Sequence, residues 1–186
     1  MQTIDNIRHV GMNHPVLVPV DFSNCSRAAL IYAARMTADT RSPLLVLHVI
    51  HDKGNEPGFY RRHHDDNPLL PIEDIASGML EDWLYKVRRE APEFDNTLRP
   101  ARTRLVSGLP GKRIVEVAEA EHAVMIVMGT RGRTGLSQLM RSSITEYVLA
   151  HACVPVTTLR EGINTTREGQ CLKFTSPVGG VISGDY

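Results

Sequence analysis

The stretch VMIVMGTRGRTGLSQLMRSSITEYVL, residues 124–149, carries the clearest indication of the fold. It begins with a nearly continuous apolar run, Val124 to Met128, which is typical of a strand covered on both faces of a parallel sheet. Glycines follow at positions 129, 132 and 135, and Ser142 to Ala150 then has apolar residues at helical spacing. The stretch therefore predicts a buried strand, a glycine-rich turn and a helix in succession.

Four further runs predict the other strands of this sheet. Val16 to Val20 and Leu44 to Val49 are also nearly continuous apolar runs, which favours a buried central position. Arg102 to Val106 and Val154 to Leu159 are more polar, and we expect them at the flanks or edges. The sequence thus predicts about five strands.

Helical patterns alternate with these strands. Residues 23–39 are rich in alanine and begin with Ser23 as a helix cap. From Ile72 onward the apolar residues follow the spacing of an amphipathic helix, and Gly111 to Ala120 predicts a further one. Alternating strands and helices form right-handed crossovers. We therefore expect an α/β fold, a doubly wound open sheet of about five mainly parallel strands with helices on both faces.

The pattern predicts one domain over residues 14–159, preceded by an N-terminal arm, residues 1–13. Within it, residues 51–71 are polar and contain glycine and proline, which predicts a long surface loop. Residues 160–186 are a C-terminal extension without an assigned role, although CLKF and VGGVI in it have the pattern of a short hairpin.

Composition excludes several classes of protein. In the 186 residues, 21 lysines and arginines balance 21 aspartates and glutamates, so we expect neither nucleic acid nor an anionic membrane as a partner. No run approaches the roughly 20 apolar residues of a membrane helix, and the first fifteen residues lack the apolar stretch of a secretory signal. The three widely spaced cysteines form no zinc pattern. These features favour a cytoplasmic protein with reduced cysteines.

Polar residues that follow the buried strands are the first candidates for a functional site. In a doubly wound sheet, ligands bind beyond the carboxyl ends of the strands, near the point where strand order reverses. Asp21 to Ser23, Ile50 to Asp52 and Gly129 to Gly135 follow three of the strands. Glycines let backbone N–H groups approach a ligand, and the next helix N-terminus favours an anion. The sequence predicts a phosphate cradle here, with a plain tight turn as the alternative.

Other motifs do not add a catalytic or metal site. The GxGxxG and GxxxxGK patterns are absent, and no GxSxG, HExxH or SxxK arrangement occurs, so we expect no catalytic residue. His63, His64, Asp65 and Asp66 are metal-capable, but adjacent histidines lack the spacing of a helical metal site. We expect a solvated loop there and no metal.

VMGTRGRTGLSQL, residues 127–139, and SSITEYVLAHACVPV, residues 142–156, resemble the signature of the universal stress protein family. PVDFS at 19–23, LHVI at 47–50 and VSGLPGKRIVEVAEAEHA at 106–123 resemble the same family in the same order. The resemblance covers roughly residues 14–159. It implies a Rossmann-like domain of the adenine-nucleotide alpha-hydrolase type, with ATP, alone or with Mg²⁺, as the ligand.

The resemblance also implies which residues hold the nucleotide. Asp21 would bind the adenosine end and Val49 would offer its backbone to the adenine ring. Pro19 and Val20 would line the same wall, with Met128 near the base. The residues implied around ribose and phosphates are Gly129, Arg131, Gly132, Ser143, Ile144 and Thr145.

Position 142 departs from the family pattern. The ATP-binding pattern expects glycine nine residues after Gly132, where this chain has Ser142. If that position needs positive φ or a close backbone approach, serine costs on the order of 1 kcal/mol and crowds a phosphate. If it is helical, its N–H stays available and its hydroxyl adds a donor. Asp21 likewise has an alternative role, capping the following helix alongside Ser23.

The function implied by the resemblance is that of a homodimeric, ATP-binding stress-response or signalling protein. In such a dimer the strand Val154 to Leu159 pairs with its twofold mate, and the nucleotide alters the surface offered to an unknown protein partner. Two alternatives remain: an interaction module of the same family that holds no nucleotide, and a weak ATPase.

Overall fold

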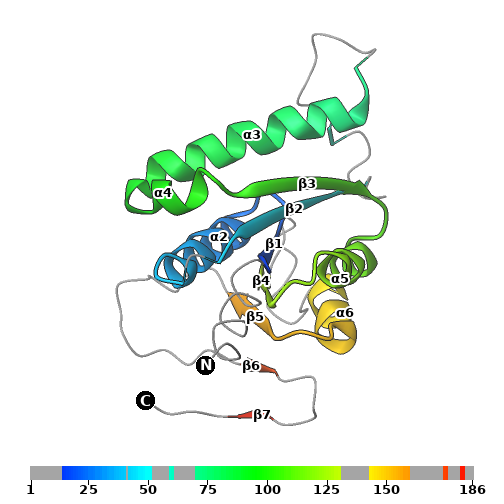
Figure 1. Ribbon diagram of the computed structural model, residues 1–186. Coiled ribbons are helices and arrows are strands. Elements are labelled where there is room, and N and C mark those ends of the chain that lie inside the picture. The colour runs from blue at the N-terminus through cyan, green and yellow to red at the C-terminus, as the bar shows by residue number, and fades with distance from the viewer. Residues whose placement is uncertain are drawn as a thin grey trace, which may run out of the picture.

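The computed structural model describes residues 14–40, 42–51, 59–60, 70–130, 143–159, 174–175 and 181–182. Within these residues the chain forms one sheet ordered β3-β2-β1-β4-β5-β6-β7 (Figure 1). The strands are β1 (Val16–Val20), β2 (Leu44–Ile50), β3 (Arg102–Ser107), β4 (Met125–Gly129), β5 (Val156–Leu159), β6 (Phe174–Thr175) and β7 (Val181–Ile182). The helices are α2 (Asn24–Thr37), α3 (Ile72–Glu90), the 3-10 turn η2 (Pro92–Phe94), α4 (Asp95–Leu98), α5 (Pro110–Ala120) and α6 (Ser143–His151).

The predicted doubly wound α/β fold is confirmed. Strands β3, β2, β1, β4 and β5 are parallel to one another, whereas β6 pairs antiparallel with both β5 and β7. The chain passes from β1 outward to β2 and β3, and then returns to β4 and β5 on the other side of β1. Figure 1 shows α2 and α3 on one face of the sheet and α5 and α6 on the other. No helix among the described residues has the length and apolar character needed to cross a bilayer.

The core is divided by the alternation of side chains along β1 and β2, which are buried over their whole length. Val16, Val18 and Val20 pack in the cluster on the α2 and α3 face. Leu17 packs in the cluster on the α5 and α6 face, together with Leu45 of β2. Burying side chains of this size contributes about 1.5–3 kcal/mol each. The central strands are therefore fixed from both sides, as their continuous apolar runs predict.

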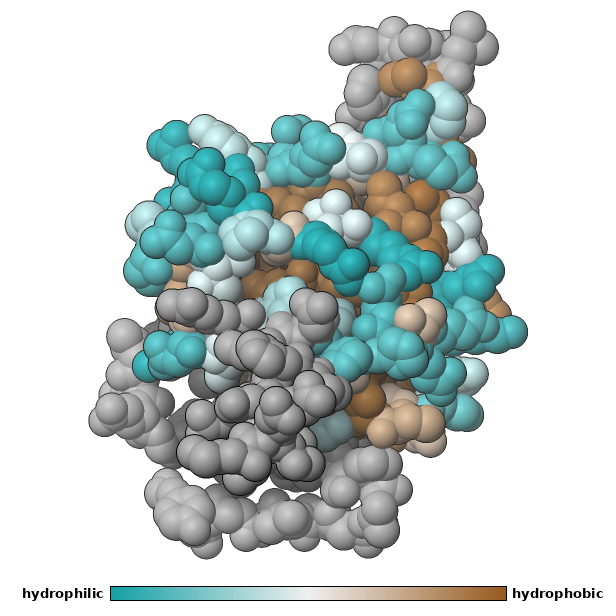
Figure 2. Space-filling model, viewed as in Figure 1, coloured by the Kyte–Doolittle hydropathy of each residue, from teal (hydrophilic) through white to brown (hydrophobic). Residues whose placement is uncertain are grey.

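Strand β3 lies at the end of the sheet, which confirms the expectation from its polar sequence. Its partly buried Leu105 packs with Trp83 and Leu84 of α3 against the same apolar cluster. In Figure 2, brown apolar residues lie between α3 and β3, while the surface along α3 is mainly hydrophilic. The long helix thus covers the sheet with one face only.

Two predicted strand boundaries were too early. Val124 is 41% exposed, and β4 begins one residue later, although the Val124 N–H donates to the Pro15 carbonyl. Strand β5 begins at Val156 because Pro155 has no N–H to donate. Its carbonyl still accepts the Ile126 N–H at 2.9 Å. The short helices η2 and α4 were not expected from the sequence.

Two segments lie outside the alternating pattern of strands and helices. The hairpin expected in the C-terminal extension is present as β6 and β7, and β6 pairs with β5 at Val156 and Thr157. Most of the segment 51–71, expected as a surface loop, lies outside the described residues. Within it Tyr60 is only 4% exposed, because its side chain packs with Ile50 and Ile75 and its hydroxyl reaches His48 on β2.

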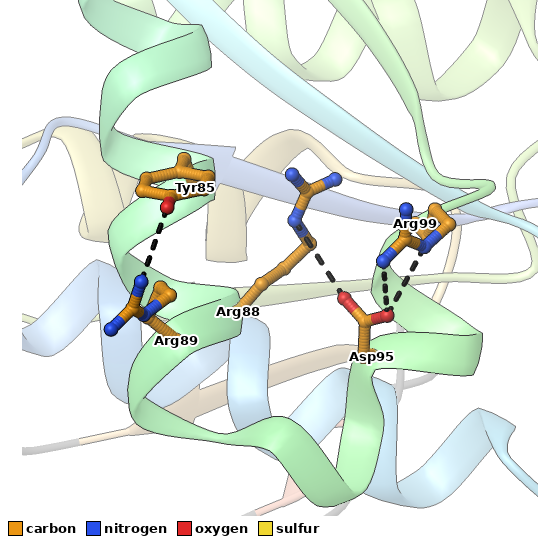
Figure 3. Close-up of polar contacts among 5 residues, drawn as sticks. All are labelled: Tyr85, Arg88, Arg89, Asp95 and Arg99. Carbon is orange, nitrogen blue, oxygen red and sulfur yellow. Dashed lines mark hydrogen bonds and ion pairs between the residues drawn. The ribbon is translucent and has the colours of Figure 1, made fainter.

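Charged residues fix the end of α3 and the short helix that follows. Asp95 accepts hydrogen bonds from Arg99, at 3.1 Å from Nε and 2.7 Å from Nη2, and lies 3.8 Å from Arg88 Nε (Figure 3). The Tyr85 hydroxyl accepts a bond of 3.2 Å from Arg89 Nη1. Exposed pairs of this kind contribute about 0.2–1 kcal/mol. They hold the turn that leads into β3 and present no unpaired carboxylate to a ligand.

Candidate functional site

The order of strands reverses between β1 and β4, and the pairing of these two strands is confined to their amino ends. Their register is confined to Val16 with Met125 and Leu17 with Ile126, although both strands continue for several residues. On its other side β1 stays paired with β2 up to Val20. Ligands of doubly wound sheets bind at such a reversal. The end of the β1–β4 pairing therefore marks the candidate site.

Pro19 explains why the ladder between β1 and β4 stops. The Val16 N–H donates to Pro43 on the β2 side of the strand. Backbone groups of successive strand residues point to opposite sides, so positions 17 and 19 face β4. The next N–H that β1 would offer to β4 is that of residue 19, and proline has none. The sequence analysis placed Pro19 on the wall of the adenosine site. In the structure its clearer effect is on the β1–β4 ladder, which lacks a donor at this position.

Gly129 ends β4 directly against the first turn of α2. A Cβ at this position would lie 2.7 Å from the Cβ of Cys25 and 2.8 Å from its carbonyl carbon, closer than real Cβ contacts. The next residue, Thr130, donates its N–H to the Leu159 carbonyl at 2.8 Å and its hydroxyl to the same oxygen at 3.1 Å. Glycine is thus required here because the helix approaches the backbone closely.

Asp21 lies in the turn between β1 and α2 and is half-buried. Its Oδ1 accepts the Ser23 N–H at 3.1 Å, and its own N–H donates to Ser26 Oγ at 3.4 Å. Ser23, not Asp21, caps α2, because Ser23 Oγ accepts the Ser26 N–H at 3.1 Å. In the part of the chain that the structure describes, no donor pairs with the second carboxylate oxygen of Asp21. One oxygen is therefore available to a ligand.

The predicted adenine-side residues lie at the ends of the central strands. Pro19 and Val20 end β1, Val49 is the penultimate residue of β2, and Met128 is the penultimate residue of β4. Val49 and Met128 share the cluster on the α5 and α6 face, whereas Val20 packs on the α2 and α3 face. All four are buried. Their side chains are thus core residues, and what they present at the sheet edge is chiefly backbone.

Of the residues predicted around ribose and phosphates, the structure describes Gly129 and those from position 143 onward. Ser143 begins α6 and is exposed, and Ile144 is partly buried against the α5 and α6 cluster. Thr145 is buried, and its hydroxyl lies 3.5 Å from the Gly129 carbonyl, a weak bond that ties α6 to the end of β4. Arg131, Gly132 and Ser142 lie outside the described residues. The structure therefore places one border of the predicted cradle.

The sequence did not identify His48 and Tyr60 as site neighbours, and it included Phe22 only as part of the range Asp21 to Ser23. His48 Nδ1 lies 2.8 Å from the Val20 carbonyl, and Nε2 lies 2.9 Å from the Tyr60 hydroxyl. Phe22 has a φ of 63° and its ring lies 4.3 Å from the His48 ring. A bulky residue in that backbone region costs about 1–3 kcal/mol and persists only where its surroundings hold it. The available signal was a single histidine inside the apolar run of β2.

The described residues supply no metal centre: they contain no group of three or more His, Cys, Asp or Glu side chains placed to hold an ion. His63, His64, Asp65 and Asp66 lie outside them. The candidate site therefore consists of one carboxylate, strand-end backbone and the start of α6.

Comparisons with known proteins agree with this architecture. A sequence model described as the universal stress protein family matches residues 12–160. Universal stress protein MJ0531 of Methanocaldococcus jannaschii is 28% identical over 155 residues, which cover 78% of this chain and 81% of that protein.

Solved structures share the fold. The structure of the protein MJ0577 of Methanocaldococcus jannaschii superposes with a TM-score of 0.60 at 22% identity, covering 82% of this chain and 99% of that one. The universal stress protein of Archaeoglobus fulgidus in complex with dAMP gives a TM-score of 0.50 at 21% identity, covering 79% of this chain and 98% of that one. Likeness at such identities establishes the fold, and the family match establishes the kinship. This chain belongs to the universal stress protein family.

Proposed function

We propose that this protein binds an adenine nucleotide, ATP alone or with Mg²⁺, where the pairing of β1 and β4 ends, and that it works as a nucleotide-responsive stress or signalling protein. The observation that carries the proposal is the convergence of Asp21 and Gly129 on the first turn of α2, beside a ladder that stops at Pro19. A similar fold in Archaeoglobus fulgidus has been solved with dAMP, which supports the ligand class.

Each proposed contact follows from the chemistry of the groups present. The second oxygen of Asp21 accepts a hydrogen bond from a ribose hydroxyl or an adenine amine. The backbone near Val49 meets the base, with Met128 beside it. The phosphates lie along backbone N–H groups from Gly129 to Thr145, including Gly132 and Ser142, where the α6 N-terminus favours negative charge. Arg131 neutralises part of that charge.

Nucleotide content and affinity test the proposal directly. Protein purified without added nucleotide should release an adenine nucleotide on denaturation, and the stripped protein should show a thermal shift with ATP and Mg²⁺. Asp21→Asn removes a charged acceptor, so the dissociation constant should rise about tenfold or more. Asp82→Asn, on the exposed side of α3, is the matched control and should leave it unchanged. An empty protein without a thermal shift would overturn the proposal in favour of the interaction module.

Pro19→Ala tests whether the proline ends the pairing between β1 and β4. The variant restores an N–H on the β4 side of β1, and we expect that amide to become protected from hydrogen exchange as the ladder extends. Closing the strands should weaken nucleotide binding. If the new amide exchanges freely and affinity is unchanged, the proline does not end the pairing.

Ser142→Gly tests the departure from the family pattern. We propose that the N–H and the hydroxyl of Ser142 are both compatible with a bound phosphate, so the glycine variant should bind ATP with unchanged affinity. A large gain in affinity would mean that the serine crowds a phosphate. Phosphate release that disappears in both Gly132→Ala and Asp21→Ala would reveal the weak ATPase.

We further propose a homodimer through the strand Val154 to Leu159. Strand β6 of the same chain competes with the second protomer for the edge of β5. Strand β6 already pairs with β5 at Val156 and Thr157, so a twofold mate must displace it there. Light scattering on the full chain and on a chain ending at residue 160 measures this. The shortened chain should dimerise more strongly, and two monomeric proteins would exclude this dimer.

A further inference from the structure

His48 is a polar residue in the centre of the apolar core. It lies in β2, whose residues are all buried, and is itself 4% exposed. Both ring nitrogens have partners, with Nδ1 at 2.8 Å from the Val20 carbonyl and Nε2 at 2.9 Å from the Tyr60 hydroxyl. A carbonyl oxygen only accepts, so Nδ1 carries the proton. Nε2 of the neutral ring then accepts the proton of Tyr60.

The two contacts of the His48 ring with the β1–α2 turn flank Asp21. On one side, the ring holds the carbonyl of Val20, the residue before Asp21. On the other, it packs against Phe22, the residue after Asp21, with ring centroids 4.3 Å apart at an interplanar angle of 35°. Phe22 has the left-handed φ of 63°. Its ring and that of Trp83 form a T-shaped pair with centroids 6.0 Å apart. The backbone that carries the carboxylate is therefore fixed before and after it.

We propose that His48 is a positioning residue of the nucleotide site, which holds Asp21 in place for the adenosine end of the ligand. This inference rests on the proposed function. Tyr60 completes the arrangement, because its hydroxyl can donate to Nε2 while Nδ1 donates to the Val20 carbonyl. Through the same bond, the segment 51–71 is connected to the site. A histidine with only a packing role would not need to act on both neighbours of one carboxylate.

Two amide variants separate the functions of the two ring nitrogens. Asn at position 48 places its amide near the position of Nδ1 and keeps the donor to Val20, while Gln extends to the position of Nε2 and loses that donor. In the stripped full-length protein titrated with ATP and Mg²⁺, His48→Gln should raise the dissociation constant about tenfold. His48→Asn should retain most of the affinity. Equal binding by the wild type and both variants would overturn the inference.

A double-mutant cycle distinguishes positioning from a general loss of structure. If His48 acts through Asp21, His48→Gln should cause no further loss of affinity in an Asp21→Asn background. Thr37→Val is the matched control, because it removes a buried hydroxyl bonded to the Ala33 carbonyl at 2.8 Å on the same face. It should change stability and leave affinity unchanged. A loss of equal size in both backgrounds would show that His48 does not work through Asp21.

Phe22→Gly keeps the proposal testable if the His48 variants do not fold. Glycine accepts the left-handed backbone and removes the ring that meets His48. The variant should fold and bind ATP more weakly, and binding like that of the wild type would contradict the proposal.

Amide exchange of Ser23, whose N–H is bonded to Asp21 Oδ1, needs no nucleotide. His48→Gln should accelerate that exchange and His48→Asn should not. A wild type that fails to bind nucleotide would overturn the function and the positioning role together. Normal nucleotide binding by His48→Gln, with unchanged Ser23 exchange, would overturn the positioning role alone.

Discussion

Two carboxylates at opposite ends of the sheet are held in different ways. Glu121 follows α5 at the amino end of the parallel strands, where Arg102 Nη2 donates to it at 2.5 Å and Arg104 donates to its other oxygen. The hydrogen bond from Arg102, aided by the charges of both arginines, lowers the pKa of Glu121. Asp21 lies at the carboxyl end, and the bond that holds it comes from the Ser23 backbone.

The difference shows at which end of the sheet the carboxylates are paired with arginines of the same chain. At the amino end, Glu121 and Asp95 are neutralised by arginines of neighbouring elements, so these charges serve the fold. At the carboxyl end, Asp21 forms no ion pair within the described part of the chain. A carboxylate with a free acceptor beside strand-end backbone is suited to a ligand.

Gly129→Ala should give the largest effect on stability. The added methyl group meets the Cβ and carbonyl carbon of Cys25 at 2.7 and 2.8 Å, and backbone cannot move aside as a flexible side chain does. Forced contacts of this kind cost about 1–3 kcal/mol. Urea denaturation should show this loss, and ATP binding should fall as well because α2 and β4 are pushed apart.

Gly78→Ala is the matched control for that variant. Gly78 lies exposed in α3, and a Cβ there meets no atom within 4 Å. Alanine favours the helix over glycine by about 0.5–1 kcal/mol, so the control should be slightly more stable. If both variants lose stability equally, the close approach of α2 to β4 is not the cause.

Ser23→Ala should give an intermediate effect at the carboxyl end. It removes the oxygen that accepts the Ser26 N–H at the start of α2, which costs about 1 kcal/mol. Thermal denaturation measures the loss. Affinity for ATP should fall only modestly, since the backbone N–H that holds Asp21 remains. A loss of binding as large as that of Asp21→Asn would mean that the two roles are not separate.

Glu121→Gln should give the smallest effect, on stability alone. Partly exposed pairs contribute up to about 1 kcal/mol, and ATP affinity should not change. A change in affinity would remove the distinction between the two ends of the sheet.

The same variant predicts a pH dependence. Because folding lowers the pKa of Glu121, its stabilising contribution is present above the unfolded-state pKa and is lost as pH falls through the lower folded-state pKa. The stability difference between wild type and Glu121→Gln should therefore narrow in acid. A difference that stays constant down to the lowest accessible pH would contradict the shift.

Sequence patterns predicted the sheet because burial on both faces requires nearly continuous apolar runs, as in β1 and β2. The predicted starts of β4 and β5 were too early, since apolar residues such as Val124 also occur in the approach to a strand. The helices η2 and α4 have too few residues to show an amphipathic period. Their position depends on packing and on charged bonds such as Arg99 to Asp95.

The candidate site was predictable where it depends on topology. Asp21 follows β1 and Gly129 ends β4, so their location at the same edge of the sheet follows from strand order alone. The approach of Cys25 to Gly129 and the burial of Tyr60 depend on distances between side chains that no spacing records. The same holds for the roles of Arg131, Gly132 and Ser142, which remain predictions.

The hydrogen bond missing between β1 and β4 at Pro19 is a consequence of covalent structure. A side chain that blocks strand pairing can rotate, titrate or be displaced, but no solvent condition adds a hydrogen to the tertiary amide nitrogen of proline. The bond between residue 19 and β4 is therefore missing in every state of the folded chain, occupied or empty. If the proposed nucleotide binds here, its binding is regulated by the nucleotide concentration or by the segments around the site, because this missing bond cannot be switched.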